Sequence, residues 1–516
     1  MTERDHDTLV RNLLASLDAS ASLIQTHISS VVIAGETVYK LKKPVDFGFL
    51  DYATLERRKR FCEEEVRINS RYAPQLYLGV VPITGSIDAP RIGGEGKAIE
   101  YAVKMRRFEP SDQLDEIAAR SAIGGSLCDA IADLASAMHA GASHVQAQSD
   151  FGTPERVLMP MIENFDLMAS LHRDGDLAEA VAEVEAWTIK EHARLTPLLR
   201  QRRERGYIRE CHGDMHLHNM ALFDGRPMLF DAIEFNPYLN HIDVISDLAF
   251  LLMDLEYRGL VSQSRRLLNR YLEKSGDYEA AALLAFYKTY RAMVRAKVLA
   301  LHAAQEIPEP ERDAVLAEVR RYVALAQSYA DAPAPFLAIT HGFSGAGKST
   351  FALMAVERYG AIRLRSDTER MRLFRKAEKK GDIYTADATE ATYARLVELA
   401  GSLVRAGYPV VADATFLKYV QRARFEMLAR DLHLPMVILD IVCDDAELRR
   451  RIRGRLNEGR DVSEADEQVL RMQQETCDPL RNGERRLCVQ IACSASALPD
   501  KLSRLLGRDD HSLRAR

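Results

Sequence analysis

The chain has 516 residues and a formal net charge of −5, with 47% hydrophobic and 28% charged residues. These values are ordinary for globular proteins and exclude a collagen-like, low-complexity or wholly disordered chain. At about 100–200 residues per domain, the length predicts two to four domains. The longest apolar runs, such as Leu248–Leu252 and Val437–Val442, are far too short to span a membrane. The small net charge gives no general reason to bind DNA or anionic lipid.

The N-terminal residues mix acidic and basic side chains and include no apolar segment, so we expect no signal peptide. The seven cysteines form no C-x-x-C pair, and their number is odd. Both features favour reduced thiols, so we expect a cytoplasmic protein. The short apolar runs predict no membrane partner.

The first part of the chain changes character near residue 110. Residues 30–43 and 98–108 are rich in β-branched and aromatic residues and predict strands, and residues 55–73 between them predict a charged helix. After residue 110 the chain is mostly helical, except for a hairpin predicted over 221–231 around Asp224-Gly225. A small β-rich lobe over about 22–108 and a larger helical lobe over about 110–330 are therefore expected.

A proline- and alanine-rich stretch at 331–335 predicts a linker between a domain over 1–330 and a domain over 336–516. Beyond the linker, apolar segments of strand type alternate with amphipathic helical segments. Such alternation predicts a parallel sheet with helices on both faces, as in α/β proteins.

A glycine-rich sequence follows the first predicted strand of the second domain. GFSGAGKST fits the pattern G-x-x-x-x-G-K-[ST], which binds phosphate through backbone N–H groups at the start of a helix. Lys348 would place its charge on the β- and γ-phosphates, and the Ser349 hydroxyl would bind Mg²⁺. The pattern predicts an ATP site made by Gly342, Ser344, Gly345, Ala346, Gly347, Lys348, Ser349 and Thr350.

Acidic side chains end the next two predicted strands. Asp367 would accept the proton of an attacking hydroxyl or would cap the following helix. Asp413 would hold Mg²⁺ through water or would also be a capping residue. A later segment is either a mobile lid that stabilises phosphoryl charge or a solvated, salt-bridged helix face; its arginines are Arg449, Arg450, Arg451, Arg453, Arg455 and Arg460.

The first domain carries a second phosphate-transfer pattern. His212, Asp214 and Asn219 have the spacing H-x-D-x-x-x-x-N of a kinase catalytic loop, with glycine where protein kinases have arginine. Asp214 would position and deprotonate an acceptor hydroxyl, while Asn219 and Asp231 would bind Mg²⁺. A metal site using His212, His216 and His218, or a purely structural loop, are the alternatives.

Such a site also needs a lysine on the phosphates and a glutamate that orients the lysine. Lys40 and Lys42 lie on the same face of a predicted strand, and we select Lys40. We select Glu65, which shares a helical face with Phe61, over Glu64. A solvated charged face is the alternative interpretation of these residues.

Residues 336–500 resemble P-loop kinases of the polynucleotide-kinase, gluconate-kinase and zeta-toxin type. The shared features are GFSGAGKST, Ser366-Asp367-x-x-Arg370, the Asp413-Ala-Thr triplet and the arginine-rich segment before SEAD. The resemblance implies that Asp367 acts on the acceptor hydroxyl and that Arg370 grips the substrate. It also implies that Arg451 and Arg455 contact ATP.

Residues 22–330 resemble the aminoglycoside phosphotransferase family, which includes choline and fructosamine kinases. The resemblance rests on HGDMHLHN at 212–219, Asp231 in LFDAIEF, and DLAFL at 247–251. It implies an α+β, bilobal protein-kinase-like fold in which Asp247 supports the catalytic loop. The chain departs from the family in having only Gly35 near 28–36, and in Glu234, which would add a metal ligand or pack the hairpin.

These features predict an ATP- and Mg²⁺-dependent phosphotransferase with two nucleotide sites, which transfers the γ-phosphoryl group to a hydroxyl of a small molecule. The whole chain resembles bacterial two-domain phosphotransferase/ATP-binding proteins. Two alternatives concern the C-terminal half, which could be a nucleotide-gated regulatory ATPase or a nucleic-acid 5′-end kinase. A protein kinase is a weaker alternative because the chain has no A-P-E motif.

Overall fold

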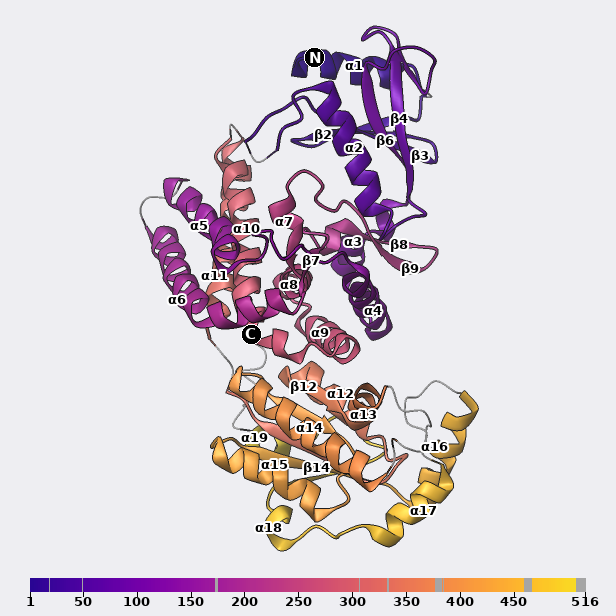
Figure 1. The fold of residues 1–516 in the computed structure, drawn as a ribbon, viewed down its shortest axis with the longest axis vertical. Coiled ribbons are helices and arrows are strands. Elements are labelled where there is room, and N and C mark those ends of the chain that lie inside the picture. The colour runs from indigo at the N-terminus through magenta and orange to yellow at the C-terminus, as the bar shows by residue number, and fades with distance from the viewer. Residues whose placement is uncertain are drawn as a thin grey trace. The chain divides into compact units, whose positions relative to one another are not determined.

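The structure, a computed structural model, describes residues 1–17, 19–48, 50–171, 175–305, 307–331, 334–375, 383, 385–458 and 466–506, without the side chains of 455–458. Contacts divide the chain into two compact units (Figure 1). The first unit comprises residues 1–259 and 285–329, and the second comprises 260–284 and 330–516. Residues 260–284 therefore pack with the second unit, although the predicted linker at 331–335 assigns them to the first domain.

The small lobe of the first unit is a six-stranded antiparallel sheet with two helices. Its strand order is β1-β2-β3-β6-β4-β5. The elements are α1 (Glu3–Ala15), β1 (Ser22–Gln25), β2 (Ser29–Ala34), β3 (Thr37–Lys42), α2 (Leu55–Asn69), β4 (Tyr77–Gly85), β5 (Pro90–Ile92) and β6 (Glu100–Arg106). Strands β2 and β3 include the segment predicted as strand over 30–43 and form a hairpin, in whose turn Gly35 has a φ of 56°. Helix α2 lies against β4 and β6 (Figure 1).

The large lobe of the first unit is mainly helical. Its helices are η1 (Pro110–Asp112), α3 (Leu114–Ala119), α4 (Gly125–Gly141), α5 (Pro154–Leu171), α6 (Asp176–Glu204), η2 (Leu217–Asn219), α7 (Pro237–Asn240), α8 (Val244–Tyr257), α10 (Leu284–Ala303) and α11 (Glu309–Ser328). Two short antiparallel pairs complete it: β7 (Ile208–Glu210) with β10 (His241–Asp243), and β8 (Met220–Phe223) with β9 (Arg226–Leu229). The turn of the predicted β8–β9 hairpin has positive φ at both Asp224 and Gly225, as a two-residue hairpin turn requires.

The second unit is a parallel sheet with strand order β12-β13-β11-β14-β15. Its strands are β11 (Leu337–His341), β12 (Ile362–Arg365), β13 (Val410–Asp413), β14 (Met436–Val442) and β15 (Cys488–Ala492). Its helices are α9 (Val261–Ser275), η3 (Tyr278–Leu283), α12 (Lys348–Tyr359), α13 (Ser366–Leu373), α14 (Ala386–Arg405), α15 (Tyr419–Asp431), α16 (Asp445–Glu458), α17 (Glu467–Thr476), α18 (Asn482–Arg485) and α19 (Asp500–Leu505). Because parallel strands end on the same edge, β11, β12 and β13 bring their carboxyl ends together.

A disulfide joins Cys443 to Cys493, so the expectation of reduced thiols is wrong for this pair. The cause is strand pairing. Strands β14 and β15 pair in register up to Val442 and Ala492, so the residues that follow lie side by side. The two cysteine Cα atoms are 5.2 Å apart, within the range that a disulfide bridges. None of the described helices is long and apolar enough to cross a membrane.

Candidate active sites

The catalytic loop of the first unit, residues 211–219, is held by two carboxylates of α8. Asp247 accepts hydrogen bonds from the backbone N–H groups of His212 (3.0 Å) and Gly213 (2.9 Å), and Asp254 accepts one from Leu217 N–H (3.0 Å). Both carboxylates are buried. Buried backbone N–H groups outside regular structure need such partners. The loop conformation is therefore fixed by α8, which agrees with the role implied for Asp247.

Gly213 is required by the shape of this loop. Its φ is 85°, which disfavours residues with a side chain. A Cβ atom at this position would also lie 2.7 Å from the carbonyl oxygen of Leu239. Arg291 from α10 donates a hydrogen bond to the Gly213 carbonyl at 2.9 Å. The glycine that replaces the arginine of protein kinases is thus explained by the local backbone.

Asp214 and Asn219, predicted from their spacing, are in direct contact. Asn219 Nδ2 donates to Asp214 Oδ2 at 2.9 Å and to the Asp214 carbonyl at 3.0 Å. His216 Nε2 lies 3.3 Å from Asp214 Oδ2. Burial alone would raise the pKa of Asp214, but its charge and hydrogen-bond interactions with His216 outweigh burial and lower it. The Asp214 carboxylate is therefore ionised at neutral pH.

His212 connects this loop to the turn that carries Asp231. Its Nε2 lies 2.9 Å from the Phe230 carbonyl, and its Nδ1 accepts the Asp214 N–H at 3.3 Å. Burial lowers the pKa of His212, so the ring is neutral, as these two opposite roles require. Phe230 N–H also donates to the Asn219 carbonyl at 3.0 Å. Asp214, Asn219 and Asp231 are thus brought to one region by backbone contacts.

The two candidate lysines both contact Glu65. Lys40 Nζ lies 2.9 Å from Glu65 Oε1, and Lys42 Nζ lies 2.7 Å from Glu65 Oε2. Burial alone would raise the pKa of Glu65, but the two lysine charges lower it to about 2. Glu64 instead pairs with Arg67 on the exposed side of α2. The structure thus joins Glu65, rather than Glu64, to the lysines.

The second partners of the two lysines differ. Lys40 also pairs with Asp231, whose side chain is 45% exposed. Lys42 pairs with Glu234 and contacts the Tyr52 hydroxyl, and all three side chains are buried or nearly so. Lys40 is therefore the lysine beside the accessible carboxylate, whereas Lys42 belongs to an internal ion-pair cluster. Glu234, left open by the sequence, is engaged with Lys42 and Tyr52.

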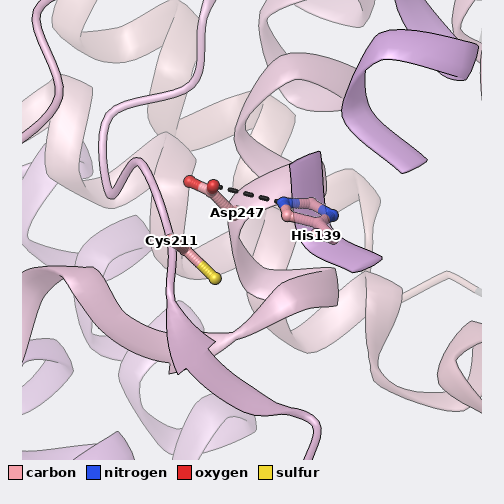
Figure 2. A group of neighbouring side chains, drawn as sticks. All are labelled: His139, Cys211 and Asp247. Carbon is pink, nitrogen blue, oxygen red and sulfur yellow. Dashed lines mark hydrogen bonds and ion pairs between the residues drawn. The ribbon is translucent and has the colours of Figure 1, made fainter. Parts of the chain in front are cut away.

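The three histidines of the loop do not form a metal site with one another. Within the described part of the chain, one other group has suitable geometry: His139, Cys211 and Asp247 (Figure 2). Asp247 Oδ2 lies 3.3 Å from His139 Nε2, but both Asp247 oxygens already accept backbone N–H groups. Burial raises the pKa of the Cys211 thiol, so it is protonated and is a poor metal ligand. We interpret this group as loop support.

In the second unit, the glycine-rich loop runs from β11 into α12, as predicted. Gly342, Gly345 and Gly347 all have positive φ, from 85° to 142°. A Cβ at Gly342 would lie 2.7 Å from the Ile441 carbonyl. Glycine adopts such conformations readily, and a glycine-rich loop at the start of a helix is a common way of binding phosphate through backbone N–H groups. Lys348 Nζ donates to the Phe343 carbonyl at 2.8 Å, across the loop.

The acidic side chains of the second unit follow the predicted strand ends. Asp413 ends β13 opposite Arg365 of β12. Its Oδ2 atom is buried and, among the described residues, has no hydrogen-bond partner. Arg370 Nη1 lies 3.5 Å from Asp367 Oδ1, so these two residues form an ion pair on α13.

The arginine-rich segment divides into two groups. Arg449, Arg450 and Arg453 pair with acidic residues on α16 and α17, which fits the salt-bridged helix face. Arg451 also pairs with Glu447 of α16, but it donates in addition to the Ala346 carbonyl of the glycine-rich loop at 3.5 Å and to the Cys493 carbonyl at 3.1 Å. The Arg455 side chain and Arg460 lie outside the described residues.

Sequence reasoning missed several residues at this site. Gln473 of α17 accepts the Ser344 N–H at 2.9 Å and donates to its hydroxyl at 3.0 Å. Arg363 Nη1 donates to the Ser349 carbonyl at 3.2 Å. No motif marks these residues, because their contacts come from segments distant in sequence.

Models of known protein families match each half of the chain. A sequence model described as "Phosphotransferase enzyme family" matches residues 53–284, and one described as "AAA domain" matches residues 337–480. "Uncharacterized protein Rv2004c" of Mycobacterium tuberculosis and "Uncharacterized protein Mb2027c" of Mycobacterium bovis are each 32% identical over 424 residues, covering 80% of this chain and 82% of theirs. The chain belongs to the same protein family as these two mycobacterial proteins. It joins an aminoglycoside-phosphotransferase-like kinase domain to a P-loop kinase-like domain.

Solved structures resemble the two domains separately. An amicoumacin kinase in complex with AMP-PNP, Ca²⁺ and Ami is 12% identical, covers 64% of this chain and 96% of its own, and has a TM-score of 0.39. A gluconokinase from Sinorhizobium meliloti 1021 is 20% identical, covers 34% of this chain and 91% of its own, and has a TM-score of 0.26. The family matches indicate phosphotransfer as the chemistry of this two-domain family.

The donor atoms at both sites suit Mg²⁺, which these kinase families use. In the phosphotransferase domain, Asn219 and Asp231 offer hard amide and carboxylate oxygens. In the P-loop domain, Asp413 Oδ2, which is buried and has no hydrogen-bond partner among the described residues, and the Ser349 hydroxyl are of the same type. When bound, the ion would neutralise phosphate charge and orient the transferring group.

Proposed function

We propose that each domain transfers the γ-phosphoryl group of ATP, with Mg²⁺, to a hydroxyl of a small molecule. The observation that carries the proposal is the arrangement in the phosphotransferase domain. Lys40 links Glu65 to Asp231, while Asp214 contacts Asn219 and His212 joins the two segments. This arrangement unites a cation for phosphate, hard metal ligands and an ionised carboxylate for the acceptor.

In the phosphotransferase domain, Asp214 orients the acceptor hydroxyl and receives its proton. The hydroxyl oxygen forms a bond to the γ-phosphorus, and the bond from phosphorus to the β–γ bridging oxygen breaks. The electron pair leaves with ADP. Lys40 places positive charge beside the phosphates, and Glu65 fixes the position of that charge.

In the P-loop domain, the N–H groups of the glycine-rich loop and Lys348 bind the β- and γ-phosphates. Asp367 receives the acceptor proton, and Arg370, 3.5 Å away, binds the acceptor. Arg451, which contacts the glycine-rich loop, adds positive charge near the transferring group. The same bonds form and break as in the first domain.

The test follows labelled γ-phosphate from ATP into the small-molecule fraction of a bacterial extract. Wild type is compared with Asp214→Asn and Lys348→Ala. Exposed matched controls are Asp224→Asn for the first domain and Lys501→Ala for the second. We expect each site variant to lose a different labelled product, and we expect the controls to retain both.

Other outcomes identify the alternatives. Loss of the same product in both variants would mean that the domains act in series or that the P-loop domain regulates the other. Salt-sensitive labelling of oligonucleotide 5′ ends would assign the P-loop domain to nucleic-acid ends. Absence of any labelled soluble product with wild type would overturn the proposal for metabolites.

A further inference from the structure

Helix α9 packs in the P-loop unit although it precedes the linker by some distance in sequence. Its residues lie within the range 53–284 matched by the phosphotransferase family, yet they contact α12 and β12 of the second unit (Figure 1). The chain crosses between the units after residues 259, 284 and 329. The second unit is therefore built partly from a segment that interrupts the first.

Two buried polar residues of α9 face β12. Asn269 and Glu273 are four positions apart and so share a helix face. Asn269 Oδ1 accepts the Arg363 N–H at 2.7 Å. Glu273 Oε2 lies 2.9 Å from Arg363 Nη2, and Glu273 Oε1 lies 3.1 Å from Arg365 Nη1. One carboxylate of α9 thus binds two arginines of one strand.

Each of these arginines reaches the phosphate side of the sheet. Arg363 Nη1 donates to the Ser349 carbonyl at 3.2 Å, directly beside the hydroxyl proposed to bind Mg²⁺. Arg365 Nε lies 3.7 Å from Asp413 Oδ2, which is beyond a good hydrogen bond. That Asp413 oxygen has no hydrogen-bond partner among the described residues. Arg365 therefore stands between Glu273 and the candidate metal ligand.

The charges explain the arrangement. Burial alone would raise the pKa of Glu273, but Arg363 and Arg365 outweigh burial and lower it, so the carboxylate is ionised. An ionised Glu273 attracts Arg365 from one side and Asp413 attracts it from the other. Arg365 and Asp413 already lie at the distance of an ion pair, and without the Glu273 charge the attraction of Asp413 would draw the guanidinium into a direct hydrogen bond.

We propose that Glu273 is a positioning residue of the P-loop site, which holds Arg365 away from Asp413 and so keeps that carboxylate available to Mg²⁺ of the bound nucleotide. The proposal rests on the nucleotide site assigned above to the P-loop domain. It means that a helix encoded within the phosphotransferase-family segment completes the metal side of the second active site. Cutting the chain at the linker would separate the P-loop from this residue.

The test measures binding of labelled ATP to the full-length protein by equilibrium dialysis, with EDTA and across a Mg²⁺ titration. Binding that Lys348→Ala removes is assigned to the P-loop site. The variants are Glu273→Gln, Arg365→Gln and the double variant. The control is Glu398→Gln, which makes the same change of charge at a side chain of the same unit that is 67% exposed.

Glu273→Gln is expected to raise the Mg²⁺ concentration needed for half-maximal enhancement of ATP binding by about 10–100-fold, as loss of a supporting partner does at metal sites. Binding in EDTA should stay at the wild-type level. The double variant should return toward wild type, because the competing arginine is also gone. Glu398→Gln should match wild type. A purely structural role would weaken binding equally with and without Mg²⁺, and the double variant would not recover.

Four results would overturn the inference. The first is an unchanged Mg²⁺ requirement in Glu273→Gln. The second is an equal loss of binding in EDTA and in Mg²⁺. If Glu273→Gln does not fold, Arg365→Gln decides alone: the inference requires an equal or lower Mg²⁺ requirement, and a higher one refutes it. If Lys348→Ala removes no ATP binding from wild type, the proposed function of this domain fails, and the inference falls with it.

Discussion

Replacing Asp247 by asparagine tests whether one buried carboxylate holds the catalytic loop of the phosphotransferase domain. Asp247 accepts two backbone N–H groups and lies 3.3 Å from His139 Nε2, with no solvent exposure. Hydrogen bonds to a charged group contribute about 1.5–3 kcal/mol each. Asparagine keeps one acceptor oxygen and turns an NH₂ group toward a backbone N–H. One buried donor is then unsatisfied, and we expect Asp247→Asn to lower the free energy of unfolding by about 3–5 kcal/mol.

The assay is equilibrium unfolding in urea, followed by the emission of Trp187. This residue is the single tryptophan of the chain and lies on α6 of the same unit. Asp166→Asn makes the same chemical change on the exposed surface of α5 and should alter the free energy of unfolding by less than about 0.5 kcal/mol. A loss below about 1 kcal/mol in Asp247→Asn would refute the reasoning, because it is smaller than one charged hydrogen bond.

The pH dependence of the same variant has a defined sign. Burial alone would raise the pKa of Asp247, but hydrogen bonding and charge from His139 and neighbouring cations lower it. A lowered carboxylate pKa means that the stabilisation is fully present above the unfolded value of about 3.9 and is lost as pH falls through the folded value. The difference between wild type and Asp247→Asn should therefore be constant near neutral pH and should narrow below about pH 3.9.

A chelator separates loop support from the metal-site interpretation of His139, Cys211 and Asp247. Both Asp247 oxygens are already occupied and the thiol is protonated, so EDTA should leave the urea midpoint of wild type unchanged. A fall comparable to that of Asp247→Asn would instead assign a metal to the group.

Substitutions of the two lysines of β3 should have different effects, one on phosphate transfer and the other on stability. The contribution of the disulfide to stability should depend on whether a reductant is present. Lys40→Met should lower phosphate transfer by the first domain about 10²–10³-fold, whereas Lys42→Met should lower the free energy of unfolding by about 3–5 kcal/mol because it leaves Glu234 without its buried cation. The reverse pattern in steady-state kinetics and urea unfolding would exchange the two roles. Cys443→Ser should lower the free energy of unfolding of the second unit by up to about 4 kcal/mol, because Cys443 and Cys493 close a loop with a sequence separation of 50. Dithiothreitol should lower the wild-type melting temperature to that of the variant, and equal melting temperatures without it would contradict the disulfide.

Local patterns in the sequence predicted most of the elements around both sites. In the second domain, apolar segments that alternate with amphipathic helical segments predicted strands β11 to β14 and helices α12, α14 and α15. In the first domain, Asp224-Gly225 predicted the β8–β9 hairpin. These predictions succeed because strand period, helix period and turn geometry depend on neighbouring residues. The disulfide was missed because it depends on the pairing of β14 with β15, which no local pattern specifies.

Lys40 and Lys42 show which features of the site local sequence patterns do not predict. A period of two places Lys40 and Lys42 on one face, and the structure brings both to Glu65. What distinguishes them is the second partner, Asp231 for Lys40 and Glu234 for Lys42, and each partner lies about 190 residues further along the chain. Spacing alone therefore narrows the choice to two, and only the tertiary contacts separate an accessible cation from an internal ion pair.

Sequence position placed α9 in the first domain because local patterns do not specify tertiary contacts. The sequence of α9 nevertheless contains a feature that points to its partner. Asn269 and Glu273 share the buried face of an amphipathic helix, and a buried carboxylate requires a cationic partner. The partners are Arg363 and Arg365, which alternate on β12 and so point to one side of the strand. The negative charge on this face of α9 complements the two positive charges on β12. Pairing these opposite charges places α9 against β12. Arg365 also lies 3.7 Å from Asp413, and this contact connects α9 to the metal ligand proposed for the P-loop domain.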